Sequence, residues 1–124
     1  MVEITKSQEE IFKVFWEIGE GAVTDVIDKL PDPKPAYNTV STVIKVLEKK
    51  GYLSHKVFGK TYVYFSIVSK KDYARFIFKD YLQGMFNNSV NQAVSFFVKQ
   101  NKVSLSELEE LKDLIEEEIK KKTK

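Results

Sequence analysis

The chain has 124 residues, a net charge of +2, and 43% apolar and 13% aromatic residues, enough for one domain, or for one small domain with an appendage. It has no cysteine, which excludes disulfides and thiolate metal sites, and its single histidine, His55, excludes a multi-histidine metal cage. We therefore expect no metal and no cofactor. No apolar run is long enough to span a membrane and no signal-peptide pattern opens the chain, so we expect a cytoplasmic protein without membrane insertion.

Charge is distributed unevenly along the sequence. Residues 1–33 carry three lysines against eight acidic residues, whereas residues 34–75 carry nine basic residues against only Glu48 and Asp72. Residues 76–124 balance eight basic with eight acidic residues. A positive segment of this kind indicates a nucleic-acid-binding face, although surface lysines also cluster without such a role.

A first helix is predicted near the N-terminus. Its apolar residues recur with helical spacing and form one stripe: Ile11, Val14, Phe15 and Ile18. Either Thr5 or Ser7 can cap its start, and Ser7 and Glu10 have the spacing of a capping box. Trp16 flanks the stripe, and we expect it in the core.

A short second helix follows a break at residues 19–21, which contain two glycines. Thr24 is a suitable cap, and the expected buried residues are Val26, Ile27 and Leu30. Three prolines at positions 31, 33 and 35 then prevent the helix from continuing and favour an extended connector. Two helices with a short break, followed by a basic third helix, indicate a helix-turn-helix.

The stretch from Pro35 to Leu53 predicts that third helix. Four apolar residues share one face, namely Val40, Val43, Ile44 and Leu47. The opposite face carries polar and basic residues: Asn38, Ser41, Thr42, Lys45 and Lys49. These side chains can hydrogen-bond base edges or phosphates, which is typical of a DNA-recognition helix. An ordinary amphipathic surface helix has the same periodicity, so the prediction of a recognition helix depends also on the segments that flank it.

Residues 52–67 change to a two-residue period and predict a β-hairpin that turns at residues 58–60. His55 is expected on the strand surface. Three helices and a hairpin with a basic tip predict a winged helix-turn-helix. The candidate contacts to base edges are Asn38, Ser41, Thr42 and Lys45, with Tyr37 at the entrance of the helix. The candidate contacts to phosphates are Lys49, Lys56 and Lys60, with Thr61 beside the hairpin tip.

Residues 71–124 predict helices with more apolar surface than they can bury among themselves, the last of them capped at Ser104 or Ser106. A second copy of the chain is the expected cover, and packing onto the winged domain is the alternative. The candidate dimerisation residues are Phe76, Tyr81, Leu82, Phe86, Phe97, Leu108, Leu111 and Ile115. The predicted fold is therefore mainly α with a small β-hairpin: a winged helix-turn-helix domain at residues 1–70 and a helical dimerisation domain at residues 71–124.

Three segments together resemble one family across essentially the whole chain. Residues 36–53, AYNTVSTVIKVLEKKGYL, resemble the recognition-helix signature of the penicillinase-repressor family of winged-helix transcriptional repressors. The segment ITKSQEEIFKVFWEIGEGAVTDVIDKL resembles the first two helices of that family, and VSLSELEELKDLIEEE resembles its C-terminal dimerisation helix. The resemblance implies a bacterial homodimer that binds double-stranded DNA at an inverted-repeat operator and represses antibiotic-resistance or stress genes.

The resemblance also implies a mode of induction, in which a membrane sensor triggers proteolysis within the dimerisation domain. The bond that matches the family's cleavage site is Phe96–Phe97. Phe96 stands where better-studied members carry asparagine, and Ser41 stands where they carry arginine. A copper-responsive branch of the family uses C-terminal cysteines, which this sequence lacks.

Two other functions remain open at the level of sequence. A small-molecule-responsive winged-helix regulator would use aromatic residues between positions 73 and 97 to line a pocket. A winged-helix protein-interaction module would bind protein, and its basic face would be incidental. An enzyme is not expected, because the sequence offers no nucleophile–base pair and no glycine-rich phosphate loop.

Overall fold

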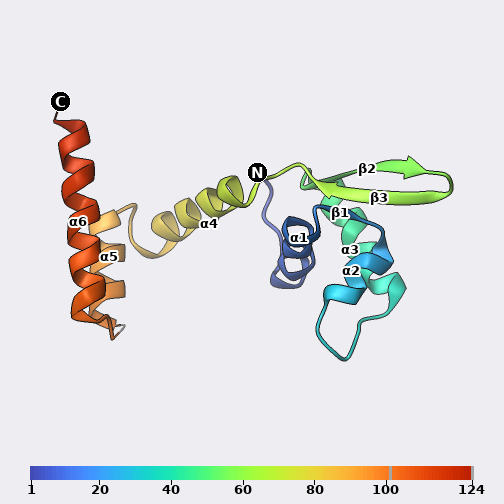
Figure 1. The fold of residues 1–124 in the computed structure, drawn as a ribbon, viewed down its shortest axis with the longest axis horizontal. Coiled ribbons are helices and arrows are strands. Elements are labelled where there is room, and N and C mark those ends of the chain that lie inside the picture. Colours follow the sequence, from blue (N-terminus) through green and yellow to red (C-terminus); the bar gives the residue numbers. More distant parts are fainter. Residues whose placement is uncertain (101, 124) are drawn as a thin grey trace. The chain divides into compact units, whose positions relative to one another are not determined.

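The computed structural model describes residues 1–100 and 102–123, which form six helices and a three-stranded antiparallel sheet (Figure 1). In chain order the elements are α1 (Lys6–Ile18), β1 (Glu20–Gly21), α2 (Val23–Lys29), α3 (Tyr37–Lys49), β2 (Leu53–Phe58), β3 (Thr61–Ser66), α4 (Lys70–Met85), α5 (Val90–Gln100) and α6 (Leu105–Lys122). The chain divides into two compact units, Met1–Phe78 and Lys79–Lys124. We call them the winged unit and the helical unit. In the described part of the chain, no helix is both long and apolar enough to cross a membrane.

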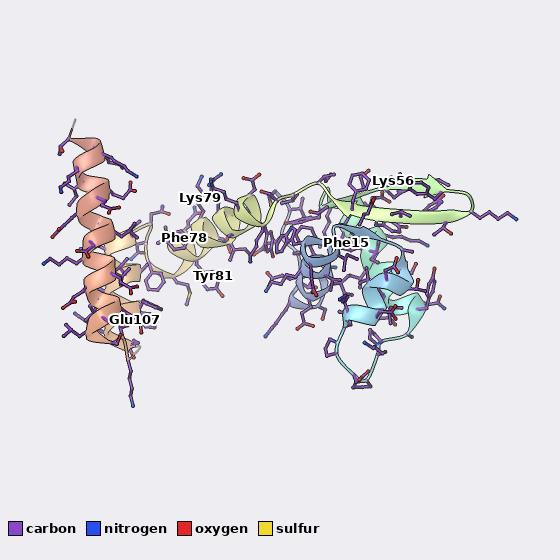
Figure 2. The ribbon with its side chains drawn as sticks, viewed as in Figure 1. Phe15, Lys56, Phe78, Lys79, Tyr81 and Glu107 are labelled. Atoms are coloured by element: carbon purple, nitrogen blue, oxygen red, sulfur yellow. The ribbon has the colours of Figure 1, made fainter. Side chains whose placement is uncertain are left out.

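The winged unit is built around aromatic side chains contributed by segments far apart in sequence. Phe12 is fully buried, and three rings approach it within 6 Å, from Trp16 at 4.6 Å, Tyr52 at 5.1 Å and Tyr73 at 5.6 Å between centroids. The three contacts are edge-to-face, which is a favourable arrangement for aromatic quadrupoles. Phe15 completes this part of the core from α1 (Figure 2). The core therefore joins α1, the start of β2 and the start of α4.

The sheet has one strand more than the predicted hairpin. The hairpin itself is confirmed, with β2 and β3 joined across Gly59 and Lys60. The segment expected only to break the chain after α1 forms β1, which pairs with β3 through Glu20 opposite Phe65 and Gly21 opposite Tyr64. A Cβ at Gly21 would lie 2.8 Å from the Ile18 Cδ1 atom and 3.0 Å from the Asp25 Cβ atom, so a larger residue there would require neighbouring side chains to shift. The pairing of β1 with β3 connects the wing, which is the hairpin of β2 and β3, to the segment between α1 and α2.

The helix caps correct part of the sequence prediction. Thr5 caps α1 as expected, but the capping box is formed with Gln8: the Gln8 amide donates to Thr5 Oγ1 at 3.2 Å, and the Thr5 amide donates to Gln8 Oε1 at 3.0 Å. The predicted Ser7–Glu10 box is wrong because Ser7 already lies within the helix. The predicted cap at Thr24 is also wrong. Helix α2 begins at Val23 and its N-cap is Ala22, whose amide donates a hydrogen bond to the Asp25 carboxylate at 2.9 Å.

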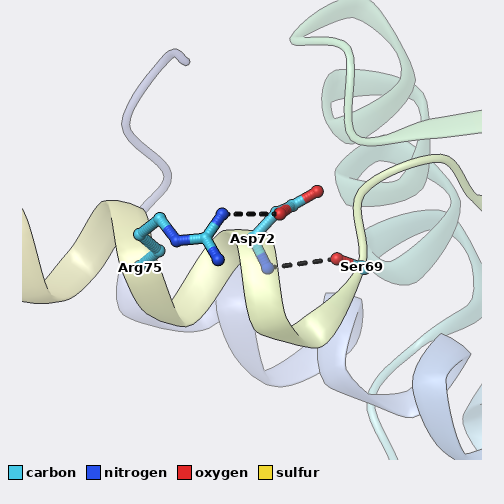
Figure 3. A network of polar contacts seen from close by, with 3 residues as sticks. All are labelled: Ser69, Asp72 and Arg75. Carbon is cyan, nitrogen blue, oxygen red and sulfur yellow. Dashed lines mark hydrogen bonds and ion pairs between the residues drawn. The ribbon is translucent and has the colours of Figure 1, made fainter. Parts of the chain in front are cut away.

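Helix α4 begins within the winged unit. The Ser69 hydroxyl accepts a hydrogen bond from the Asp72 amide at 3.0 Å, and Arg75 lies 3.3 Å from the Asp72 carboxylate (Figure 3). Tyr73, on the first turn, is buried, and its hydroxyl donates to Glu9 Oε2 at 2.6 Å. The contacts of α4 with this core continue to Ile77, beyond residue 70 where the predicted DNA-binding domain ends.

The helical unit has little buried surface of its own. Among residues 90–100 and 105–122, all of which the structure describes, no side chain is buried. Phe86 and Phe96 contact each other at 5.7 Å between ring centroids. Ser104 caps α6, accepting from the Glu107 amide at 3.1 Å, so it is the correct choice of the two serines considered. The mainly helical fold class with a small sheet is thus as predicted.

Candidate nucleic-acid interface

Helix α3 presents its polar face to solvent. Its apolar side packs on α1 and α2 and buries Val40, Ile44 and Leu47, while Val43 is half-buried. The predicted contact residues Asn38, Thr42, Lys45 and Lys49 are exposed, and Ser41 is half-buried. The Thr42 hydroxyl donates to the Asn38 carbonyl at 2.8 Å, so its oxygen and methyl group, rather than its proton, are free for an outside partner.

A cavity of ≈ 440 Å³ lies between α3, the start of α2 and the wing. It brings together five of the residues chosen from sequence, namely Tyr37, Ser41, Lys45, Lys60 and Thr61. The other residues that line it are Ala22, Val23, Thr24, Tyr62 and Tyr64. We call this cavity the helix–wing groove. Asn38, Thr42 and Lys49 are not among the residues that line it, and they lie on α3 beside it.

The helix–wing groove is electropositive. Lys45 enters from α3 and Lys60 from the hairpin turn, and none of the described residues that line the groove is acidic. Hydroxyl groups of serine, threonine and tyrosine supply neutral hydrogen-bonding partners. A polyanion with its own donors and acceptors, such as a nucleic acid, fits this combination of charge and polarity.

The two faces of the wing differ in character. Leu53, His55 and Val57 alternate along β2 with Ser54, Lys56 and Phe58, and the cross-strand partners of the first set are Ser66, Tyr64 and Tyr62. Leu53 and Tyr64 are buried, so their face is turned toward the helices. Lys56 lies on the other face, outside the groove.

Lys56 is already engaged on that outer face. Its Nζ lies 2.6 Å from the Glu20 carboxylate and 5.3 Å from the centre of the Phe58 ring. The two side chains of the ion pair are 46% and 50% exposed, so the pair stabilises the fold by at most about 1 kcal/mol. A phosphate contact by Lys56 stays a prediction, and it would require the phosphate to compete with Glu20.

Sequence reasoning missed the aromatic wall of the groove. Tyr62 is half-exposed and Tyr64 is buried, and both come from β3. Burial raises the pKa of Tyr64, and the nearby Glu48 carboxylate raises it further, so this hydroxyl keeps its proton. The alternation of the strand contained the signal, because residues 62 and 64 share the face of His55 rather than that of Lys56. The selection of basic residues alone overlooked it.

The candidate dimerisation residues fall into two groups. Phe76 packs against the core of the winged unit, and Leu82, Phe86 and Leu111 are half-buried. The others are exposed, at 60% for Tyr81, 53% for Phe97, 37% for Leu108 and 53% for Ile115. Both residues of the candidate cleavage bond lie within α5, and Phe96 is 57% exposed.

Comparisons with known proteins agree over most of the chain. The family model described as penicillinase repressor matches residues 4–117. The chain is 27% identical over 121 residues to the penicillinase repressor of Bacillus licheniformis, covering 97% of this chain and 94% of that protein. It is 25% identical over 114 residues to the methicillin resistance regulatory protein MecI of Staphylococcus aureus (strain N315), covering 91% of this chain and 93% of that protein. Among solved structures it is similar to the DNA binding domain of the repressor BlaI, with a TM-score of 0.50 and 29% identity over 57% of this chain and 88% of that one.

Proposed function

The chain belongs to the penicillinase repressor family, as the resemblance of its sequence predicted, and from this premise we propose that it is a homodimer that represses transcription at an inverted-repeat operator. Membership of the family makes it a winged-helix, DNA-binding transcriptional repressor. The homodimer, the operator and the mode of release are our proposal. The observation that supports operator binding is the helix–wing groove, where polar residues of α3 and the basic turn of the wing meet.

In the proposed complex α3 enters the major groove of DNA. Asn38, Ser41 and Lys45 then face base edges, where asparagine pairs well with adenine and lysine with guanine. Thr42 offers its methyl group to thymine. Lys60 and Thr61, at the turn of the wing, meet the phosphate backbone beside the same groove, and Lys49 meets it at the end of α3. Tyr37 lies at the start of α3, where the DNA backbone would approach the groove.

Apolar side chains of the helical unit support the homodimer. Four large apolar side chains are each more than half exposed, namely Phe97, Leu114, Ile115 and Ile119. Burying them against a second copy would stabilise the dimer by about 25 cal/mol for each Å² of apolar surface removed from water. A two-fold dimer presents two α3 helices to half-sites about 10 base pairs, or a multiple of that, apart. A lone protomer makes half of these contacts and binds far more weakly.

Release of the operator is proposed to follow cleavage of the Phe96–Phe97 bond in response to a membrane sensor or protease pathway. This bond lies in α5, whose side chains are at most half-buried. Cleavage there would separate α6 from the winged unit and so remove part of the surface assigned to the dimer. Since the relatives are named for penicillinase and methicillin resistance, genes for antibiotic resistance are the proposed targets, with stress genes as the wider class.

The test is a selection of binding sites from a randomised pool of duplex DNA, followed by mobility shifts and sedimentation of the complex. We expect a two-fold symmetric sequence bound by two protomers, with affinity that falls steeply as salt rises. Recovery of no sequence above random at low salt would contradict the proposal and favour a protein-interaction module. A small molecule that abolishes operator binding without any cleavage would instead favour a ligand-responsive regulator.

A further inference from the structure

Three side chains connect the recognition helix to the inner face of the wing. Glu48, in the last turn of α3, has its Oε2 atom 2.5 Å from Nδ1 of His55 on β2, so the imidazole N–H donates to the carboxylate. The His55 ring stacks on Tyr62 of β3, with 4.5 Å between centroids and 7° between planes. Tyr62 in turn lines the helix–wing groove. These contacts connect Glu48 of α3, through His55 of β2, to Tyr62 in the lining of the groove.

These contacts contribute little to the stability of the fold. Glu48 and His55 keep 30% and 31% of their side chains exposed, and pairs exposed to this degree contribute at most about 1 kcal/mol. Tyr62 is 51% exposed, so the stack leaves half of it in contact with water. The aromatic ring is therefore held in a fixed orientation at a surface, rather than buried.

The negative charge of Glu48 connects these contacts to DNA binding. Glu48 is the only acidic residue in the sequence between positions 34 and 71, which contains α3 and the wing. A free carboxylate there would repel the phosphates of DNA. The hydrogen bond from His55 holds this carboxylate at the base of the wing, and Glu48 is not among the residues that line the groove.

We propose that Tyr62 contacts a phosphate of the bound DNA through its hydroxyl, and that His55 and Glu48 are positioning residues that hold the Tyr62 ring in place. The hydroxyl of tyrosine is a common donor to phosphate oxygens. Lys45 and Lys60 line the same groove and attract the backbone to it. This inference rests on the proposed function, and it adds a neutral contact whose geometry depends on a residue of the recognition helix.

The experiment is a double-mutant cycle on operator affinity with the full-length protein. Tyr62→Phe keeps the ring and removes the hydroxyl, and we expect about a tenfold loss of affinity. His55→Ala removes the stack and is expected to lose at least as much. In the His55→Ala background the further change Tyr62→Phe should cost less than about twofold, because the hydroxyl is then no longer in position.

Further variants and measurements separate positioning from folding. Ser54→Ala, next to His55 but on the outer face of the wing, should leave affinity unchanged. Glu48→Ala removes the acceptor of the His55 hydrogen bond, so the cost of Tyr62→Phe should also shrink in this background. Thermal unfolding is measured for each variant, and His55→Gln, which lacks the ring, replaces His55→Ala if the latter does not fold. Since Tyr62 is uncharged, Tyr62→Phe should leave the salt dependence of binding unchanged, unlike Lys60→Ala.

The outcomes are distinguishable. If the unmodified protein binds no DNA sequence above random, the proposed function fails together with this inference. If it binds its operator but Tyr62→Phe has no effect, or costs the same factor with and without His55, the operator function stands and the inference is wrong.

Discussion

The winged unit buries many of its apolar residues, whereas the helical unit leaves most of its apolar residues exposed. In the winged unit, fourteen side chains form one buried core, among them Phe12, Phe15 and Tyr52 at no more than 1% exposure. In the helical unit, α5 and α6 bury none of their described side chains, although they carry phenylalanine, leucine and isoleucine throughout. The first unit therefore has a buried core of its own, whereas the second leaves large apolar side chains exposed to water.

The polar surfaces of the two units differ as well. Around the helix–wing groove, lysine, hydroxyl and aromatic groups converge without an acidic neighbour in the lining. On α6 the acidic and basic residues alternate in blocks, and the closing Lys120–Lys122 complement the helix dipole. This difference supports the proposed function, in which the winged unit binds DNA and the helical unit binds a second copy of the chain through apolar contacts.

The largest expected effect tests how much the buried core stabilises the winged unit. Phe12→Ala should lower the free energy of unfolding by about 3–5 kcal/mol, because it removes a buried ring that three other rings contact. Urea unfolding followed by the fluorescence of Trp16 measures this change. Phe58→Ala is the matched control, since Phe58 lies in the same unit at 61% exposure and should cost less than about 0.5 kcal/mol. Equal losses for the two variants would break the distinction between core and surface.

The next effect tests the apolar surface of the helical unit. Ile115→Asp should dissociate the proposed dimer and weaken operator binding about 100-fold or more, with little change in the unfolding of the winged unit. Sedimentation velocity gives the oligomeric state and mobility shifts give the affinity.

The matched control for that change is Lys112→Asp, which introduces the same carboxylate at an exposed polar position of α6. Lys112→Asp should leave the proposed dimer intact. An Ile115→Asp protein that remains dimeric would show that this part of α6 is not the contact surface, and dissociation of both variants would point to net charge as the cause.

The winged unit could be predicted from sequence more completely than its site could. The period of Val40, Ile44 and Leu47 gives the buried face of α3, and that face is buried as predicted. The strand β1 was missed because two residues carry no periodicity, and their pairing depends on where β3 lies. Cap positions were missed where a side chain other than serine or threonine, here Asp25, satisfied the backbone.

The site itself depends on contacts between elements, and spacing along one element does not report these. Ser41, Lys45, Lys60 and Thr61 were chosen by residue type and meet in the helix–wing groove. Lys56 was chosen by the same reasoning, but its side chain pairs with Glu20, which lies far away in sequence. Tyr62 was not chosen, since an aromatic residue in a strand more often packs in a core than binds a ligand.

A smaller effect separates electrostatic from apolar binding. Lys60→Ala should weaken binding to operator and random DNA by about the same factor, and reduce the slope of log affinity against log salt by about 1, because a phosphate contact is lost. Lys56→Ala should do less, since Glu20 already neutralises this lysine. Fluorescence anisotropy across a salt series measures both slopes. The proposed dimer, which we expect to be held by apolar contacts, should dissociate no more readily over the same series.

If Lys56→Ala changed the slope as much as Lys60→Ala, the outer face of the wing would be a DNA contact as well. The predicted role of Lys56 would then be confirmed, and the groove would be one part of a wider interface.

The smallest effect concerns how α4 is fixed to the winged unit. The hydrogen bond from the Tyr73 hydroxyl lowers the pKa of Glu9, with Lys13 and Lys6 adding to it against the opposing effect of burial. A carboxyl group whose pKa is lowered in the folded state stabilises the fold above its unfolded pKa, and that stability is lost as pH falls through the folded value. Tyr73→Phe should therefore lower the free energy of unfolding by about 1 kcal/mol at pH near 7, and by less once the pH lies well below the usual glutamic acid range. Urea unfolding at several pH values measures the difference.

The control is Glu9→Gln, whose free energy of unfolding should also approach that of the unmodified protein at low pH. If Tyr73→Phe instead lowered the free energy of unfolding by the same amount at every pH, the Tyr73 hydroxyl would stabilise α4 through some group other than the Glu9 carboxylate.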